Sequence, residues 1–294
     1  MKLEQTVTLS TIGAELERPA PPIPEDDPLE RPLRLHERLW RTDAFRKGLI
    51  LVVLAVGWEL YAAHMDNPLL APTLSATMAA FREALLHEEL LLKALTSLKI
   101  LLCGYAGGVA AAAILTVIAI SSRLGSDLLE MLTAMFNPLP AIALLPLALI
   151  WFGLGAPSII FVMVHSVLWP IALNTHAGFT GVSPTLRMVG RNYGLRGLPF
   201  VTKILIPAAL PNILTGLKVG WAFAWRTLIA AELVFGVSSG SGGLGWYIYE
   251  KKNQLEIASV FAGLCSVILI GIMVENMVFR TAERLTVNRW GMRH

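Results

Sequence analysis

Long runs of apolar residues alternate with short polar segments over most of this chain. A run of about 18 or more apolar residues is long enough to cross a bilayer as a helix. Six such runs occur, at roughly residues 48–65, 94–120, 128–152, 158–177, 212–235 and 257–279. The pattern therefore predicts an all-α integral membrane protein with six transmembrane helices.

Basic residues gather on one side of the predicted spans and so indicate the orientation of the chain. Residues 31–47, before the first span, contain six basic and two acidic residues. The segment 183–207, between the fourth and fifth spans, has four basic residues and no acidic residue. The C-terminal tail is also basic. Because cytoplasmic segments carry an excess of Lys and Arg, we expect both termini and the 183–207 segment in the cytoplasm.

These patterns divide the chain into four parts. Residues 1–47 form a polar, Pro-rich cytoplasmic tail, whose composition is typical of an extended, solvated chain. Residues 48–93 hold the first transmembrane helix and an amphipathic helix on the outer face. Residues 94–280 form a core of five spans, and residues 281–294 form a basic cytoplasmic tail.

The loop over residues 183–207 carries the local signals of two short helices. Ser183 is a favourable N-cap, and Pro184 suits the first helical position. Gly194 suits the position just after a helix end, where the backbone often turns left-handed. Pro207 interrupts the segment that follows. We therefore expect an ordered cytoplasmic loop.

Charged residues and prolines within the spans are costly there and are candidates for function. Pro138 and Pro140 should kink the third span, whose freed carbonyl groups must face protein or a cavity, so we expect this helix to line a pathway. Arg226 in the fifth span must face a partner or water. Two interpretations stay open: an ion pair with Glu59 of the first span, or contact with an anionic solute. Glu232 is a further candidate for the pathway.

Composition excludes several functional classes. The chain is 55% hydrophobic and 15% charged, whereas a soluble domain is about 25% charged. The net charge of +3 is small and follows the topology, so we expect no nucleic-acid partner. No Walker A, zinc-protease or hydrolase motif occurs, so we expect no catalytic residues in this chain. The two Cys and six His residues are scattered and predict no metal site.

The 183–207 loop resembles the "EAA loop" of ABC-importer permeases. That pattern reads Glu-Ala-Ala, three residues, Gly, nine residues, Ile, one residue and Leu-Pro, and here Gly194, Ile204 and Pro207 fall at its spacing. The opening triplet differs, with Met188, Val189 and Gly190 in its place. In the family this loop docks in a groove of the ATPase subunit. The resemblance implies a coupling role for Arg187, Met188, Val189, Gly190, Arg191, Gly194, Ile204 and Pro207.

Four shorter motifs resemble the nitrate, sulfonate and taurine branch of that superfamily. They are residues 149–155, 206–217, 230–233 and 243–245. The resemblance implies the type I importer fold in a bacterial inner membrane, with two copies of this chain, two cytoplasmic ATP-binding subunits that bind ATP and Mg²⁺, and an external solute-binding protein. It implies no cofactor in this chain. The implied solute is a small anion such as nitrate, a sulfonate, taurine, bicarbonate or an organic carboxylate.

Two alternatives stay open at this stage. An ion-coupled secondary transporter would have similar spans but would need no ATPase, and the spacing of the docking loop argues against it. An importer of an uncharged vitamin precursor would keep the same fold and partners, but it would not need a cationic pathway.

Overall fold

The computed structural model describes residues 42–87, 90–235 and 242–288, and these residues form helices with no strand among them. Most of the predicted N-terminal tail (residues 1–41) and the end of the C-terminal tail (residues 289–294) lie outside the described part. The chain separates into two units, Met1–Ala55 and Val56–His294. Helix α3 (Asp43–Met65) begins in the first unit, and the packing described below is that of the second.

Among the described residues, five helical segments are long and apolar enough to cross a membrane. They are α3, α5 (Leu90–Ser121), α8 (Ala156–Thr180), the segment Leu198–Val234 that contains most of α11 (Ile206–Phe235), and the segment Ile257–Thr286 that starts with α13 (Ile257–Val274). Each coincides with one of the spans predicted from the apolar runs, because the requirement for a long apolar stretch is local in sequence.

The predicted third span, residues 128–152, differs from the kinked helix that we expected. It consists of two separate parts joined through Pro138 and Pro140: α6 (Arg123–Phe136), and η1 (Ala141–Leu144) followed by α7 (Leu145–Phe152). The two parts are bent by 85° and count as a sixth span when taken together. Proline lacks the N–H group that would continue the hydrogen bonds of the helix, and its ring clashes with the preceding turn, so two closely spaced prolines end α6 instead of bending it.

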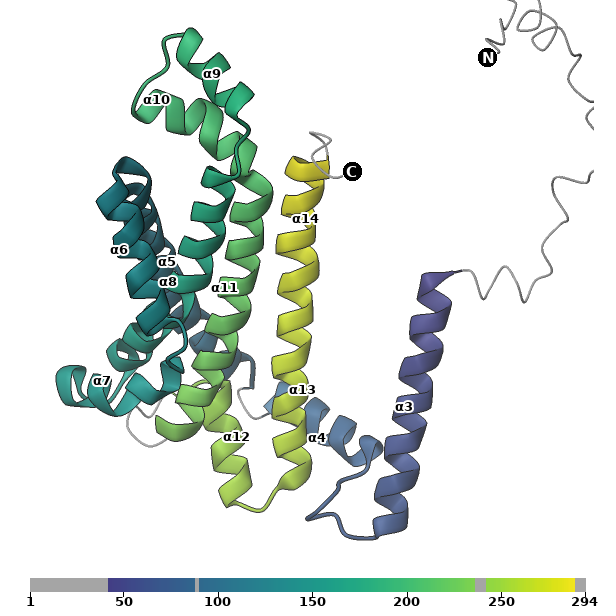
Figure 1. Cartoon of the computed structure of the whole chain (residues 1–294). Coiled ribbons are helices and arrows are strands. Elements are labelled where there is room, and N and C mark those ends of the chain that lie inside the picture. Colours follow the sequence, from purple (N-terminus) through teal and green to yellow (C-terminus); the bar gives the residue numbers. More distant parts are fainter. Residues whose placement is uncertain (1–41, 88–89, 236–241, 289–294) are drawn as a thin grey trace, which may run out of the picture. The chain divides into compact units, whose positions relative to one another are not determined.

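The remaining helical segments are short. They are α4 (Leu74–His87), α9 (Pro184–Asn192), α10 (Leu198–Phe200), η2 (Val201–Leu205), α12 (Leu244–Asn253), η3 (Glu275–Phe279), α14 (Arg280–Glu283) and η4 (Arg284–Asn288). Figure 1 shows α9 and α10 at the same end of the second unit as α14, with α7 and α12 at the opposite end. Helix α4 is the predicted amphipathic helix, whereas no helix was predicted over α12.

Helix α8 is the centre of the packing, because it lies along both α5 and α11. Glycines allow this close approach. A Cβ atom at Gly108 of α5 would lie 2.5 Å from the Cβ of Val167, and one at Gly220 of α11 would lie 2.9 Å from Cγ1 of Ile171. Small residues at such crossings let helices pack tightly in a membrane. Helices α5, α8 and α11 therefore form the frame that positions the 183–207 loop.

Candidate functional site

Helix α9 opens the 183–207 loop with the cap that the sequence predicted. The hydroxyl oxygen of Ser183 accepts a hydrogen bond from the N–H of Leu186 at 3.3 Å, and Pro184 occupies the first turn. This cap satisfies one of the N–H groups that the start of a helix leaves without an intrahelical partner. The beginning of α9 is thus determined by its local sequence.

The end of α9 is set by Gly194, which has a φ of 72°. The N–H of Gly194 donates to the carbonyl of Arg191 at 2.9 Å, and the N–H of Leu195 donates to the carbonyl of Gly190 at 3.1 Å. Two such bonds around a left-handed residue form the Schellman motif. The predicted left-handed turn at Gly194 is confirmed, and after it the chain continues into α10.

Residue 190 must be small because α9 crosses closely over the second half of the loop. Gly190 is buried, and a Cβ atom there would lie 2.9 Å from both Cγ1 of Ile204 and Cε2 of Phe200. A larger side chain would push the two halves of the loop apart. Gly190 and Ile204, both assigned to coupling from the loop pattern, therefore hold the loop itself together.

The outer surface of the loop exposes large apolar side chains. The exposed fraction is 58% for Met188, 42% for Val189, 82% for Tyr193 and 77% for Leu198. Apolar side chains gathered on the surface of a short loop indicate contact with another protein or with the membrane. Of the triplet that opens the EAA-like pattern, Met188 and Val189 thus face outward, whereas Gly190 faces inward.

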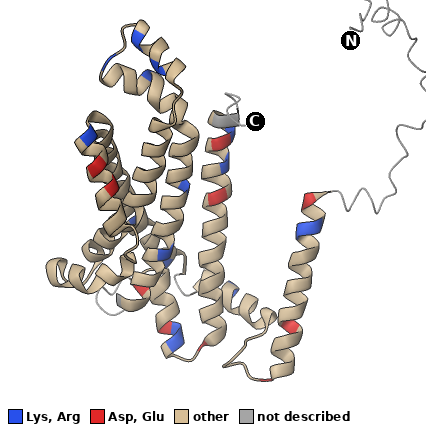
Figure 2. Cartoon of the chain, viewed as in Figure 1, with Lys and Arg blue, Asp and Glu red and all other residues tan. Residues whose placement is uncertain are grey.

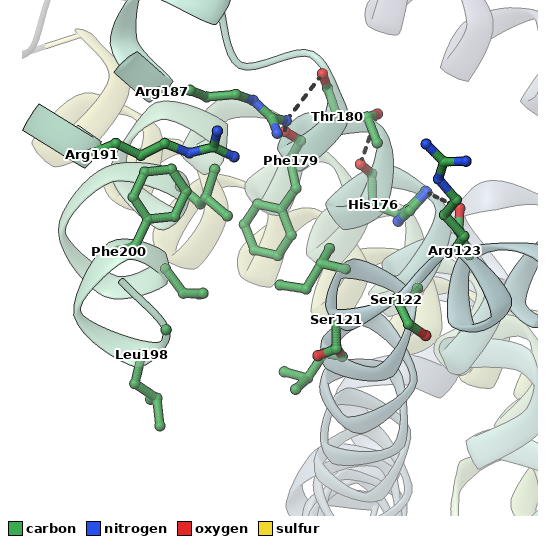
Figure 3. Close-up of a pocket in the computed structure, with 17 residues that line it drawn as sticks. Ser121, Ser122, Arg123, His176, Phe179, Thr180, Arg187, Arg191, Leu198 and Phe200 are labelled. Carbon is green, nitrogen blue, oxygen red and sulfur yellow. Dashed lines mark hydrogen bonds between the residues drawn. The ribbon is translucent and has the colours of Figure 1, made fainter. Parts of the chain in front are cut away.

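Arg187 makes contacts within the chain that the sequence did not predict. Its Nε donates to the carbonyl of Val182 at 3.2 Å, and its Nη2 donates to the carbonyls of Phe179 and Thr180 (Figure 3). These carbonyls end α8 and its following turn, where a positive charge also interacts favourably with the helix dipole. Arg187 therefore fastens α9 to the C-terminal end of α8.

Helix α11 exposes a partly polar face within its membrane-spanning part. Asn212, Thr215, Phe223 and Arg226 are all exposed. At 3.6 residues per turn their positions fall within an arc of roughly 80°. Figure 2 shows few charged residues along the spans, so a charged residue on an exposed face of α11 is unusual. Polar groups in a membrane must meet protein or water instead of lipid, and the face therefore requires a cover.

Arg226 is the charged residue of that face. Its Nε donates to the carbonyl of Ala222 at 3.2 Å, and the guanidinium carbon lies 5.3 Å from the centre of the Phe223 ring. Within the described ranges, no carboxylate forms an ion pair with Arg226. The guanidinium therefore keeps N–H donors available on an exposed surface, beside an aromatic ring that stabilises its charge.

The ion pair between Glu59 and Arg226, one of the two interpretations left open, is not formed. Both oxygens of the Glu59 carboxylate instead accept hydrogen bonds from Ser75, one from the hydroxyl at 2.7 Å and one from the backbone N–H at 3.1 Å. Ser75 lies in the first turn of α4, whose free N–H groups attract a carboxylate. Glu59 is therefore a cap for the outer helix.

Glu232 lies at the end of α11 away from the loop and is only 4% exposed. Its carboxylate accepts hydrogen bonds from the hydroxyl of Ser97 and from the N–H of Gly245, each at 2.8 Å. The Ser97 oxygen in turn accepts a hydrogen bond from the N–H of Leu244 at 2.8 Å. This network joins α11, α5 and the first turn of α12. A place for Glu232 in a pathway stays a prediction.

Pro138 and Pro140 are exposed at the corner between α6 and η1. The carbonyl of Pro140 accepts a hydrogen bond from the N–H of Ala143 at 2.9 Å, so the new helical segment starts directly after the second proline. Both prolines are therefore accessible to water or to a second chain. Its predicted role beside a pathway stays a prediction.

Lys218, a second cation of α11, was missed in the sequence. Its ammonium group forms an ion pair with Glu275 of η3, and an oxygen of Glu283 lies 4.0 Å from the same nitrogen. Opposite charges near the cytoplasmic ends of the fifth and sixth spans were the available signal. The cluster joins α11 to the C-terminal helical segment. No group of three His, Cys, Asp or Glu residues in the described ranges could hold a metal ion.

Comparison with known proteins gives a consistent result. Residues 104–287 match the family model described as "Binding-protein-dependent transport system inner membrane component". The chain is 32% identical over 222 residues to a protein of Methanocaldococcus jannaschii named as an ABC transporter permease, covering 74% of this chain and 82% of the relative. It is 27% identical over 274 residues to the taurine transport system permease protein of Escherichia coli, covering 86% and 95%. It is 26% identical over 247 residues to a nitrate import permease protein of Synechocystis, covering 82% and 88%.

Proposed function

This chain belongs to the family of inner membrane components of binding-protein-dependent transport systems, and from that premise we propose that two copies of it form the pathway of an ATP-driven importer for a small anion. The chain is a multi-pass inner-membrane permease of the ABC type. Its family implies an ATP-binding subunit and a solute-binding protein in the same system. We place ATP and Mg²⁺ in two cytoplasmic ATP-binding subunits and assign no cofactor to this chain.

The exposed polar face of α11 is the observation that carries the proposal. Asn212, Thr215 and Arg226 lie on the surface of a membrane-spanning helix, where contact with lipid would be costly. A second copy related by a two-fold axis would bring the two α11 faces opposite each other and enclose a polar passage. The passage would then be lined by the groups that are exposed in a single chain.

An anionic solute agrees with the chemistry of this face. Arg226 offers N–H donors in a planar arrangement that suits nitrate, sulfonate and carboxylate oxygens. The names of relatives point in the same direction, since they include permeases for taurine, aliphatic sulfonates and nitrate. An uncharged vitamin precursor would not need this guanidinium. Selective uptake of anions would therefore distinguish an importer of small anions from an importer of such a precursor.

The loop supplies a rigid connection between the ATP-binding subunit and the pathway. Phe179 of α8 and Val182 just after it form a buried cluster with Leu205 of η2 and Ala209 of α11. Arg187 ties α9 to the same end of α8. A movement of the docked loop would therefore carry α8 and α11 with it, because packed side chains move as a unit. In our proposal, ATP binding and hydrolysis drive this movement and alternate the opening of the pathway.

Reconstituted vesicles test the function directly. The permease is inserted with its ATP-binding subunit, ATP is enclosed on the cytoplasmic side, and the solute-binding protein is added outside with a labelled anion. Uptake should require the ATP-binding subunit, the binding protein and ATP together. Uptake that follows an ion gradient without the ATP-binding subunit would contradict the proposal and favour a secondary transporter.

Gly194→Val should weaken docking of the ATP-binding subunit in this assay. Valine is strained at the φ of 72° that closes α9, at a cost of about 1–2 kcal/mol. We expect at least about a fivefold loss of co-purified ATP-binding subunit and a similar loss of uptake. Gly194→Asn is the matched control, because asparagine tolerates left-handed backbone, and it should stay close to wild type. Normal docking and uptake by Gly194→Val would contradict the coupling role.

Cysteine crosslinking should detect the two-fold axis. In a chain with Cys103 and Cys265 replaced by alanine, single cysteines at Thr215 or Phe223 should form crosslinked dimers with a short bifunctional reagent. A cysteine at Ile114 of α5, which is 64% exposed, is the control for random encounters and should give few dimers. Equal yields at Ile114 and on α11, or no dimer at either α11 position, would count against a shared axial pathway.

A further inference from the structure

A cavity of about 770 Å³ opens between the α5–α6 turn and the 183–207 loop (Figure 3). It is bounded by the last turns of α5 and α8, the first turn of α6, helix α9 and the α10–η2 segment. The α5 and α8 spans end here, at Ser121 and Thr180, so the cavity lies at the level of the cytoplasmic membrane surface. None of the described residues that line it is acidic.

Three arginines make the cavity strongly positive from two opposite sides. Arg187 and Arg191 extend from α9, and Arg123 lies across from them at the start of α6 (Figure 3). Arg187 donates to the end of α8, whereas no described carboxylate forms an ion pair with Arg123 or Arg191. His176 also lines the cavity, and its buried Nδ1 has no hydrogen-bond partner among the described residues. The site therefore offers several groups for binding one anion.

The stability of α6 does not account for Arg123. This residue is the first of the helix, directly after the N-cap Ser122, and it is exposed. The helix dipole disfavours a positive charge at that position and favours an anion. An anion bound in the cavity would interact well with both the guanidinium and the helix start.

The membrane side of the cavity is apolar. Val117 and Ile120 line it there from the last turns of the α5 span, whereas Val201 and Leu205 of η2 add apolar groups from the loop. The order of polar groups at the membrane surface and apolar groups below it is the order found in a phospholipid. A small inorganic anion would leave most of the 770 Å³ unfilled, because one water-sized group takes about 30 Å³.

We propose that this cavity binds one anionic phospholipid of the cytoplasmic leaflet. Its headgroup occupies the space between Arg123 on one side and Arg191 on the other, and the upper part of its acyl chains lies along Val117 and Ile120. Basic pockets between transmembrane helices on this side of the membrane suit such headgroups, and arginine binds phosphate through paired hydrogen bonds. Because Arg123 belongs to the core and Arg191 to the loop, the lipid joins the two and steadies the docking surface. This inference goes beyond the transport function and does not depend on the solute.

Lipid retention by the purified complex tests this site. The complex with its ATP-binding subunit is equilibrated with phosphatidylglycerol and phosphatidylethanolamine, and tightly bound lipid is measured by native mass spectrometry. Wild type should retain phosphatidylglycerol in preference to phosphatidylethanolamine. Arg123→Gln should lower the retained phosphatidylglycerol about fivefold, the effect expected for one basic residue at a membrane surface. Lys203→Gln is the matched control, because Lys203 is exposed on the same loop outside the cavity, and it should retain wild-type amounts.

A second variant tests the apolar part without changing any charge. Val117→Trp fills the membrane side of the cavity and should lower phosphatidylglycerol retention as Arg123→Gln does. Unchanged retention in both variants, or equal retention of the two lipids by wild type, would overturn the proposal. Thermal stabilisation of the lipid-depleted complex by inorganic phosphate alone, lost in Arg123→Gln, would overturn it in favour of a free anion. Crosslinking of a photoreactive residue at position 123 to the ATP-binding subunit would overturn it in favour of a protein contact.

Discussion

Arg226→Gln is expected to lower anion uptake at least about tenfold while leaving the assembled complex intact. The guanidinium lies exposed on α11, and its position is supported by Ala222 and Phe223 of the same helix. Glutamine removes the positive charge and retains fewer N–H donors. We therefore expect the interaction with the solute to weaken and the assembly of the complex to stay unchanged. A hydrogen bond to a charged group contributes about 1.5–3 kcal/mol, which corresponds to about a 10- to 150-fold loss of uptake. Uptake into reconstituted vesicles and the yield of complex are the two measurements.

The control for this variant is Arg82→Gln, because Arg82 is an exposed arginine on the outer helix α4. It should leave both measurements unchanged. A fully active Arg226→Gln would contradict a contact between Arg226 and the solute. A fall in assembled complex that matches the fall in uptake would instead assign Arg226 to the contact between the two copies. A loss of the Glu59 pair cannot explain either result, since Glu59 is bonded to Ser75.

Glu232→Ala is expected to destabilise the outer end of the protein by on the order of 2–5 kcal/mol. The substitution leaves the hydroxyl of Ser97 and the N–H of Gly245 buried without their acceptor. A Cβ atom at Gly245 would lie 2.5 Å from the Cβ of Glu232, so the backbone of α12 is packed directly against this side chain. Melting of the detergent-solubilised complex should shift to lower temperature, and the yield should fall.

Glu232→Gln keeps the volume and one acceptor oxygen, and its loss should be smaller than that of Glu232→Ala. Glu130→Ala is the matched control, because Glu130 is an exposed glutamate on α6. Equal melting temperatures for Glu232→Ala and Glu130→Ala would contradict a structural role for Glu232. If Glu232→Gln melts like wild type but loses uptake, Glu232 has a role in the pathway in addition to its structural contacts.

The apolar runs were sufficient to predict the membrane-spanning segments. Each membrane-spanning segment coincides with a run of apolar residues, because lipid acts on every position of the segment at once. The ends of α9 were equally predictable, since Ser183 and Gly194 act through hydrogen bonds to residues within a few positions along the chain. The left-handed backbone at position 194 favours glycine for steric reasons, so the turn could be predicted from the glycine in the sequence.

Only the tertiary structure decided which residues far apart in the sequence meet. Pro138 and Pro140 indicated a break, but the 85° between α6 and the η1–α7 segment depends on how both pack on the bundle. The sequence placed Glu59 near Arg226, whereas packing of α4 brought it to Ser75. A carboxylate within the protein bonds to the donors nearest to it in space. Its position along the chain does not determine which donors these are.

The two short motifs at 230–233 and 243–245 show the same limit. Each was visible as a family pattern, but only the fold places the carboxylate of Glu232 on the N–H of Gly245 and on Ser97, 135 positions earlier. The cytoplasmic cavity is a stronger case, because five separate segments contribute to it and none carries a motif for it. The sequence by itself thus determined the membrane-spanning segments and the local turns, which depend on neighbouring residues and on the bilayer. The polar contacts and the cavity depend on helix packing, which brings together groups that no local pattern connects.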